Sequence, residues 1–176
     1  MKNQKVQDKN FEIYLKENYI KERVSLLSKE IHQSMKGKTP HFVAILNGAF
    51  VFASDLLRAY PSPCKISFVK LNSYKGIKSS GIVHELIGLK EIPNKECIII
   101  LEDIVDTGTT LKKLEEIFKK NHWYIATLFF KPKAYEYNRH IDFVGFEIPN
   151  DFIVGYGLDY EGFGRNLKNV YQLAKA

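Results

Sequence analysis

The chain has 176 residues, of which 45% are hydrophobic and 26% are charged, and its formal net charge is +6. This composition is ordinary for one globular domain with a proper core. No apolar run approaches membrane-spanning length, and residues 1–10 are polar and unlike a signal peptide, so we expect a cytoplasmic protein with no membrane partner.

The positive charge suits either nucleic acid or a small polyanionic substrate. The lysines are scattered along the chain and form no basic block, which favours an ordinary solvated surface. The two cysteines, Cys64 and Cys97, lie in apolar contexts. This placement indicates buried, reduced thiols and argues against a disulfide or a metal site.

The segment up to Tyr19 is polar with scattered aromatic residues, and we expect it to begin as a loose arm. A helix is predicted from Ile20, because apolar residues then recur at helical spacing, and Gly37 is its expected stop. Residues 41–46 read as a short apolar strand. A tight turn at residues 47–49 and a helix over residues 50–60 complete a first strand–turn–helix unit.

Residues 65–71 alternate in polarity and are predicted to form a strand. The run over residues 72–81 is polar and contains glycines and lysines. It could be an ordinary mobile hairpin loop, but we favour a lid that closes over a site and excludes water. Residues 82–89 would be its return strand, and residues 93–95 would form a turn.

The most informative stretch is residues 97–111. An apolar, β-branched run is followed by Glu102 and Asp103, then by Asp106, and then by a small, hydroxyl-rich turn that leads into a helix after Leu111. Ligands of α/β sheets bind at the carboxyl ends of strands, and a helix N-terminus binds anions. Acids beside a phosphate would repel it unless they face sugar hydroxyls, a divalent metal or a proton to be removed. A phosphorylated sugar with Mg²⁺ satisfies all three conditions.

After that helix, residues 124–130 are predicted to form a buried strand that ends at Lys131. Strand-like runs follow over residues 141–148 and 152–156, and a last one over residues 170–173. The alternation of strands and helices predicts an α/β fold with a mostly parallel sheet.

Residues 98–111 resemble the phosphoribosyl-pyrophosphate (PRPP) binding motif of type I phosphoribosyltransferases. Residues 24–165 resemble the hypoxanthine/guanine phosphoribosyltransferases of purine salvage, with a strong family motif over residues 142–149, Asp-Phe-Val-Gly-Phe-Glu-Ile-Pro. The resemblance implies a single type I phosphoribosyltransferase domain over residues 1–176, with helices flanking the sheet. The core would span about residues 20–131. A small hood would form from the N-terminal arm and about residues 132–176, and the protein would be a homodimer or homotetramer.

The implied reaction transfers 5-phosphoribose from PRPP to N9 of a 6-oxopurine (hypoxanthine, guanine or xanthine) and releases pyrophosphate. Asp106 would act as base near purine N7, and Ser73 and Tyr74 would open the catalytic lid. Glu102 and Asp103 would hold the ribose hydroxyls, partly through Mg²⁺, and Asp159 would bind a second Mg²⁺ directly or through water. The residues implied for ribose and phosphate are Glu102, Asp103, Asp106, Thr107, Gly108, Thr109 and Thr110.

The resemblance assigns pyrophosphate to Asn47, Gly48 and Arg165, and a non-proline cis peptide to the Leu46–Asn47 bond. Family members often carry lysine where this chain has Asn47, but a backbone amide can bind phosphate whatever the side chain. For the purine, Lys131 would meet the oxygen at C6, Phe152 would stack on the ring, and the backbone of Ile153 would meet its edge.

Two rival interpretations remain open. One is a regulatory or nucleic-acid-binding protein on the same fold, although no basic stripe supports it and we expect no nucleic-acid partner. The other is a phosphoribosyltransferase for adenine or a pyrimidine, against which stand Lys131, Phe152 and Ile153. The sequence does not rank hypoxanthine, guanine and xanthine.

Overall fold

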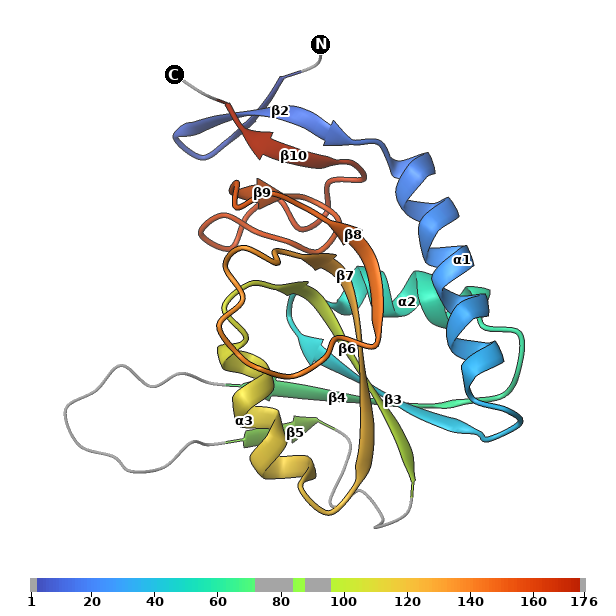
Figure 1. Ribbon diagram of the computed structural model, residues 1–176. Coiled ribbons are helices and arrows are strands. Elements are labelled where there is room, and N and C mark those ends of the chain that lie inside the picture. The colour runs from blue at the N-terminus through green and yellow to red at the C-terminus, as the bar shows by residue number, and fades with distance from the viewer. Residues whose placement is uncertain (1–2, 72–83, 88–95, 175–176) are drawn as a thin grey trace, which may run out of the picture.

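The computed structural model describes residues 3–71, 84–87 and 96–174 and contains two β-sheets and three helices in these ranges (Figure 1). The large sheet contains β3 (Pro40–Leu46), β4 (Lys65–Leu71), β5 (His84–Ile87), β6 (Cys97–Val105), β7 (His122–Phe130) and β8 (Phe143–Glu147). The small sheet contains β1 (Gln4–Val6), β2 (Lys9–Leu15), β9 (Ile153–Val154) and β10 (Val170–Leu173). The helices are α1 (Glu17–Ser34), α2 (Phe50–Ala59) and α3 (Thr109–Phe118).

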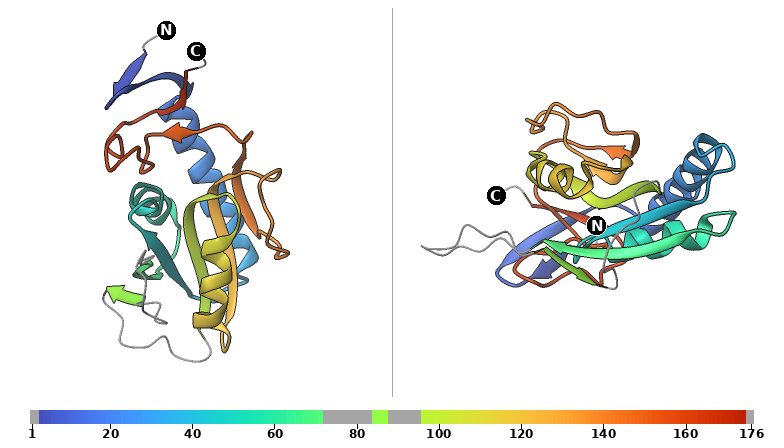
Figure 2. Two further views of the ribbon diagram at one scale, coloured as in Figure 1. Left: turned by 90° about the vertical axis from the view of Figure 1, so that its left-hand side faces the viewer. Right: turned by 90° about the horizontal axis from the view of Figure 1, so that it is seen from below.

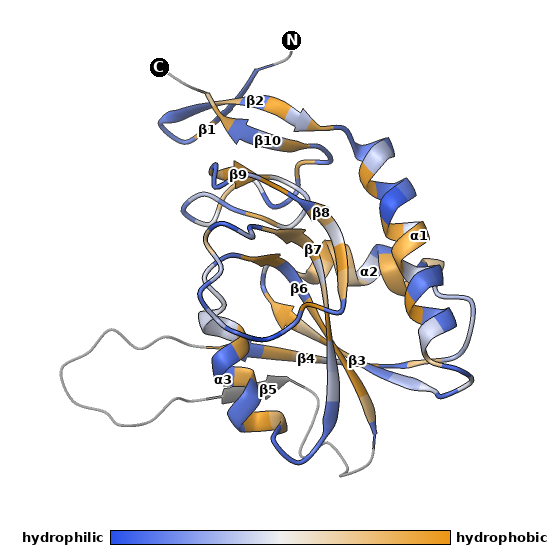
Figure 3. Ribbon diagram, viewed as in Figure 1, coloured by the Kyte–Doolittle hydropathy of each residue, from blue (hydrophilic) through white to orange (hydrophobic). Residues whose placement is uncertain are grey.

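The large sheet has the strand order β5-β4-β3-β6-β7-β8. Neighbouring strands from β4 to β8 are parallel, and β5 pairs antiparallel with β4. The central strands β3 and β6 are almost continuously apolar, as expected where helices cover both faces of a parallel sheet (Figure 3). The predicted α/β class with a mostly parallel sheet is therefore confirmed.

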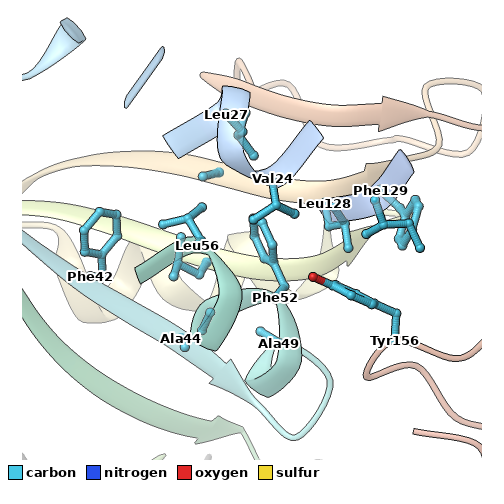
Figure 4. Close-up of a cluster of buried hydrophobic side chains, with 14 of the residues drawn as sticks. Val24, Leu27, Phe42, Ala44, Ala49, Phe52, Leu56, Leu128, Phe129 and Tyr156 are labelled. Atoms are coloured by element: carbon cyan, nitrogen blue, oxygen red, sulfur yellow. The ribbon is translucent and has the colours of Figure 1, made fainter. Parts of the chain in front are cut away.

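The helices bury their apolar faces on opposite sides of the large sheet. Side chains of α1 and α2 pack together over one face, where Leu27, Phe52 and Leu128 belong to one buried cluster (Figure 4). Leu111 and Leu114 of α3 pack with Ile100 and neighbouring side chains in a second cluster on the other face. Burial of these side chains fixes α3, and hence its N-terminus, against the sheet.

The small sheet has the order β1-β2-β10-β9 and is stacked at one end of the large sheet, where both termini lie (Figure 2). The expectation of a loose N-terminal arm was wrong, because residues 4–15 form an antiparallel hairpin that also pairs with β10. Two apolar residues explain why this segment is folded against the protein: Val6 and Phe11 are buried in a third cluster with Val154 and Tyr171.

The chain after Lys131 is divided between the two sheets. Strand β8 pairs in parallel with β7 in the large sheet, whereas β9 and β10 belong to the small sheet. At the exposed edge of β8, the guanidinium of Arg23 donates to the carbonyls of Val144 and Gly145 at 2.7 and 2.9 Å. Arg23 of α1 thus supplies hydrogen-bond donors to two carbonyl groups of β8, the edge strand of this sheet.

The remaining predicted elements agree with the structure to within a few residues. Helix α1 begins at Glu17, earlier than expected, and β5 lies inside the predicted return strand. The proposed lid at residues 72–81 and the turn at residues 93–95 lie outside the described residues. Cys64 and Cys97 are both free and partly buried. None of the helices in the described ranges is long and apolar enough to cross a membrane.

Candidate active site

Strand β6 continues past the point where its apolar run was expected to end. The ladder to β7 extends through Glu102, which pairs with Thr127, to Val105, which pairs with Phe130. The strand continues because Ile104 and Val105 add further apolar residues between two neighbouring strands. Since side chains alternate along a strand, Glu102 and Asp103 point to opposite faces of the sheet.

Residues 106–108 form a turn that we call the phosphate turn. The Glu102 side chain lines a pocket together with this turn. Glu102 is 5% exposed, and its Oε2 has no hydrogen-bond partner among the described residues. Burial raises the pKa of Glu102 well above its usual range, and the charge of Asp103 adds to this shift. A hydrogen bond from Thr110 lowers the pKa and only partly opposes the other two effects. An unpaired buried oxygen of this kind suits a ribose hydroxyl or a cation.

The phosphate turn connects β6 to α3. Gly108 has φ +86°, a left-handed conformation that favours glycine, and it caps the N-terminus of α3. The Thr107 and Thr109 hydroxyls lie 2.9 Å apart, and the Thr109 amide donates a long hydrogen bond of 3.4 Å to the Thr107 hydroxyl, whereas Gly108 has no side chain that could cap the helix. The amides at this helix N-terminus can serve an anion, which would compete with the Thr107 hydroxyl for the Thr109 amide.

The pocket holds about 290 Å³ of empty space, partly open to solvent. It brings together six of the seven residues expected to bind the sugar phosphate, and Asp103 is the one that it leaves out. Its lining consists of Glu102, Ile104, Val105, Asp106, Thr107, Gly108, Thr109, Thr110 and Leu111.

Asp103 instead faces the turn after β3. The Leu46–Asn47 peptide in that turn is cis, as the resemblance implied. A Cβ added at Gly48 would overlap the carboxylate of Asp103, and a Cβ added at Gly157 would overlap the carbonyl oxygen of Gly48. Gly48 is therefore enclosed between β6 and the loop after β9, and only a residue without a side chain fits there.

The loop after β9 carries Asp159 and Arg165 in an ion pair, with 2.6 Å between Arg165 Nη2 and Asp159 Oδ1. Arg165 also donates to the carbonyl of Gly157 at 2.8 Å, and the Gly162 amide donates to Asp159 at 2.7 Å. Sequence reasoning alone offered no reason to choose either residue. Their contacts position this loop beside Gly48.

The charges of Arg165 and Asp159 both affect the pKa of Asp103. Burial raises the pKa of Asp103 from 3.8 to about 6. Its own amide and that of Ile104 act in the opposite direction, as does the charge of Arg165, whereas Asp159 raises the pKa further. A carboxylate that is costly to ionise in this environment would gain from a nearby cation.

Glu102 and Asp103 offer Mg²⁺ one carboxylate on each face of β6, and they do not form a cage. Within the described parts of the chain, no three His, Cys, Asp or Glu side chains are gathered closely enough to hold an ion. Mg²⁺ commonly takes one or two carboxylates and completes its coordination with water and substrate phosphate. The unpaired oxygen of Glu102 and the raised pKa of Asp103 are compatible with that arrangement.

The residues expected to recognise the purine lie on two parts of the fold. Lys131 follows β7, is buried, and pairs with Asp106. Ile153 is the first residue of β9 in the small sheet, and Phe152 directly precedes it. Phe152 is 44% exposed, and its ring lies edge-on to Tyr160 with 5.8 Å between centroids. Ile153 is buried.

Three tyrosines near the site were not predicted. Tyr156 points into the core beside Phe52 and donates to Asp55 of α2 at 2.6 Å, which anchors the loop after β9 (Figure 4). Tyr135 and Tyr137 contact Gly108 from a loop whose sequence has no periodic pattern. Ser73 and Tyr74, the predicted lid residues, lie outside the described residues.

Comparison with known proteins shows similarity over nearly the whole chain. A family model described as phosphoribosyl transferase domain matches residues 11–161. A hypoxanthine-guanine phosphoribosyltransferase from Aquifex aeolicus is 39% identical over 174 residues, covering 96% of this chain and 97% of the relative. A hypoxanthine phosphoribosyltransferase from Salmonella typhimurium is 36% identical over 165 residues, covering 90% and 93%. The crystal structure of a hypoxanthine phosphoribosyltransferase from Staphylococcus aureus matches with a TM-score of 0.81 at 34% identity, covering 93% of this chain and 91% of that one.

Proposed function

The chain belongs to the phosphoribosyl transferase family, and we propose that it transfers 5-phosphoribose from PRPP to N9 of a 6-oxopurine in purine salvage. The names of its relatives from Aquifex aeolicus and Salmonella typhimurium support hypoxanthine and guanine as acceptors. The same relatives do not favour the alternative of a regulatory or nucleic-acid-binding protein.

The observation that carries the proposal is one pocket that is lined both by the N-terminus of α3 and by an unpaired carboxylate oxygen of Glu102. The amides and the threonine hydroxyls of residues 107–110 would bind the 5′-phosphate, and Gly108 would let the backbone approach it closely. Glu102 would accept hydrogen bonds from the ribose hydroxyls. Because phosphate and hydroxyls lie on one sugar, a single pocket with both kinds of group suits phosphoribose.

Pyrophosphate would leave toward the Gly48 turn on the other side of the sugar. The backbone of Asn47 and Gly48 would bind its oxygens, and Arg165 would pair with it, since a guanidinium fork suits phosphate. Glu102 and Asp103, on opposite faces of β6, would each offer a carboxylate to Mg²⁺, which would offset the negative charge of the leaving group when bound. Asp159 remains the proposed ligand of a second ion, directly or through water, and would share its carboxylate with Arg165 and Gly162.

The purine would lie between the end of β7 and the small sheet. Lys131 would donate to the oxygen at C6, and Asp106 would hold or remove a proton at N7 as N9 forms its bond to ribose. Phe152 would stack on the ring, and the backbone of Ile153 would meet its edge. The proposed lid, with Ser73 and Tyr74, would keep water from the positively charged ribose in the transition state.

Steady-state kinetics with PRPP and Mg²⁺ test this function. Hypoxanthine, guanine and xanthine are supplied in turn, with adenine as the matched control base, and pyrophosphate release is measured together with nucleotide formation. We expect equimolar pyrophosphate and nucleotide with at least one 6-oxopurine and little product with adenine. Turnover of adenine alone, or of none of the bases, would contradict the proposal.

We also propose that the enzyme works in the cytoplasm as a homodimer or homotetramer, as the family resemblance implies. Sedimentation equilibrium of the purified chain tests the assembly, and a monomer at all concentrations would contradict it.

A further inference from the structure

The loop that follows Lys131 runs alongside the phosphate turn and contacts it repeatedly. The backbone amide of Lys131 donates to the carbonyl of Val105 at 2.9 Å, and its Nζ lies 3.2 Å from Asp106 Oδ2. Five residues further on, the amide of Glu136 donates to the carbonyl of Thr107 at 3.2 Å. The turn is thus held from outside by a second segment of the chain.

Two tyrosines of this loop close around Gly108. A Cβ added at Gly108 would lie 2.6 Å from Tyr137 Cβ and 2.7 Å from Tyr135 Cε2, so no side chain fits between them. Gly108 is also the residue with φ +86° at which the turn becomes α3. The tyrosines therefore contact the phosphate turn at the residue where it joins α3.

Both tyrosines are fixed independently of the turn. Tyr135 donates to the carbonyl of Arg139 at 2.8 Å, and its ring meets Phe130 edge-on with 5.3 Å between centroids. Tyr137 donates to the carboxylate of Glu115 on α3. Burial and this acid raise the pKa of Tyr137 to about 12.

Arg139 secures the far end of the loop. Its guanidinium lies over the Trp123 ring, 3.5 Å from the centroid, and donates to the Trp123 carbonyl at 3.0 Å. It also lies 3.7 Å from Glu115. The loop is consequently tied to β7, the strand that pairs with β6, and to α3.

From this arrangement we propose that Tyr135 and Tyr137 are positioning residues, which hold Gly108 and its neighbouring amides in the orientation that binds the 5′-phosphate. The inference rests on the proposed function, because it assigns the anion at this turn to the phosphate of PRPP. The tyrosines touch the turn and not the reacting atoms. Their loss should therefore weaken binding of the sugar phosphate more than binding of the base.

The test compares Tyr135→Ala with Tyr135→Phe, which keeps the ring against Gly108 and loses only the hydroxyl. We expect Tyr135→Ala to raise KM for PRPP about tenfold, as for a small displacement of binding groups, with KM for hypoxanthine nearly unchanged. Tyr135→Phe should retain a KM for PRPP close to that of the wild type. Titration calorimetry provides a second readout: IMP, which carries the 5′-phosphate, should bind Tyr135→Ala about tenfold more weakly, whereas magnesium pyrophosphate should bind as before.

A second variant, Tyr137→Phe, removes only the hydrogen bond to Glu115 and should raise KM for PRPP about threefold. It keeps the proposal testable if Tyr135→Ala does not fold. Equal losses for PRPP and hypoxanthine, or unchanged IMP binding in both variants, would overturn the inference. If the wild type binds IMP but has no transferase activity, the proposed function fails, and the IMP titrations still decide whether the tyrosines position the turn.

Discussion

The ammonium group of Lys131 lies 3.2 Å from the carboxylate of Asp106, and the lysine residue is only 7% exposed. A buried cation of this kind needs a partner, and Asp106 supplies the opposite charge. Because O6 and N7 are neighbouring atoms on one edge of a 6-oxopurine, a lysine and an aspartate in contact would meet both atoms together. The pair links the end of β7 directly to the phosphate turn.

Replacing Asp106 by asparagine tests its role as base. The asparagine side chain would keep the size and much of the hydrogen bonding of the carboxylate, but it cannot accept the purine proton. We expect Asp106→Asn to lower kcat by about 10²- to 10⁴-fold while PRPP affinity changes little. Steady-state kinetics and calorimetric titration with PRPP measure the two effects. Glu116→Gln, which changes an exposed acid on α3, is the matched control, and near-normal turnover of Asp106→Asn would remove Asp106 from the base role.

Lys131→Ala should impair use of the purine and leave PRPP affinity largely intact. The lost hydrogen bond involves a charged donor, so we expect KM for hypoxanthine to rise by about one to two orders of magnitude. Asp106 loses its partner in this variant, but its side chain is 44% exposed and water can solvate it. Lys133→Ala removes an exposed lysine two residues away and should have no effect. Unchanged purine kinetics in Lys131→Ala would show that the base is recognised elsewhere.

Gly48→Ala should weaken the proposed binding of pyrophosphate at the turn after β3 without unfolding the protein. The new methyl group would overlap Asp103, so either the turn or the carboxylate has to move. We expect PRPP and pyrophosphate to bind at least about tenfold more weakly, since a displacement near 1 Å can cost that much. Calorimetric titration with magnesium pyrophosphate measures the loss.

Gly37→Ala is the control for Gly48→Ala. Gly37 has φ +82° and no atom within 4 Å of an added Cβ, so only backbone strain is introduced. This strain should lower the free energy of unfolding by about 1 kcal/mol and leave ligand binding unchanged. Equal pyrophosphate affinity in both variants would show that the Gly48 turn does not bind the leaving group.

Asp103→Asn should stabilise the metal-free protein at neutral pH. The pKa of Asp103 is raised from 3.8 to about 6, so the folded state holds this proton to a higher pH than the unfolded state does. The folded protein therefore loses stability as pH rises through about 4 to 6, and the penalty persists above that range. Asparagine carries no charge and removes the penalty. We expect a gain on the order of 2 kcal/mol in the free energy of unfolding near pH 7.5, vanishing near pH 3.5.

Urea unfolding at the two pH values, with a chelator present, measures this gain. Addition of Mg²⁺ together with pyrophosphate should then stabilise the wild type more than Asp103→Asn, because the variant lacks the charge that the ion would neutralise. A stability difference that does not change with pH would show that the carboxylate of Asp103 ionises in the folded protein as freely as in water.

Much of the large sheet was predictable because its strands are short apolar runs and its helices have one apolar face. The end of β6 was misplaced, since Glu102 and Asp103 interrupt the apolar run although Ile104 and Val105 continue the strand. The N-terminal hairpin was missed for a different reason. Only Val6 and Phe11 are deeply buried there, and their partners Val154 and Tyr171 are far away in sequence.

The candidate site was predictable where its residues are consecutive, as in the phosphate turn. The separation of Asp103 from the pocket follows from strand alternation, once β6 is known to continue. By contrast, the pairs Lys131–Asp106 and Arg165–Asp159 depend on tertiary packing and have no local pattern. The same is true of Tyr135 and Tyr137, which reach Gly108 only because the loop folds back over α3.

The position of β10 between β2 and β9 has a consequence for biosynthesis. Tyr171 pairs with Ile13 on one side and with Val154 on the other, so β9 reaches the N-terminal hairpin only through β10. All strands of the large sheet have left the ribosome once residue 147 has emerged, whereas the small sheet must wait for residues 170–173. Since Ile153 and Val170 also belong to the main core cluster of the large sheet, and a domain folds as a unit, the core of the nascent chain would be completed only after this last strand has emerged.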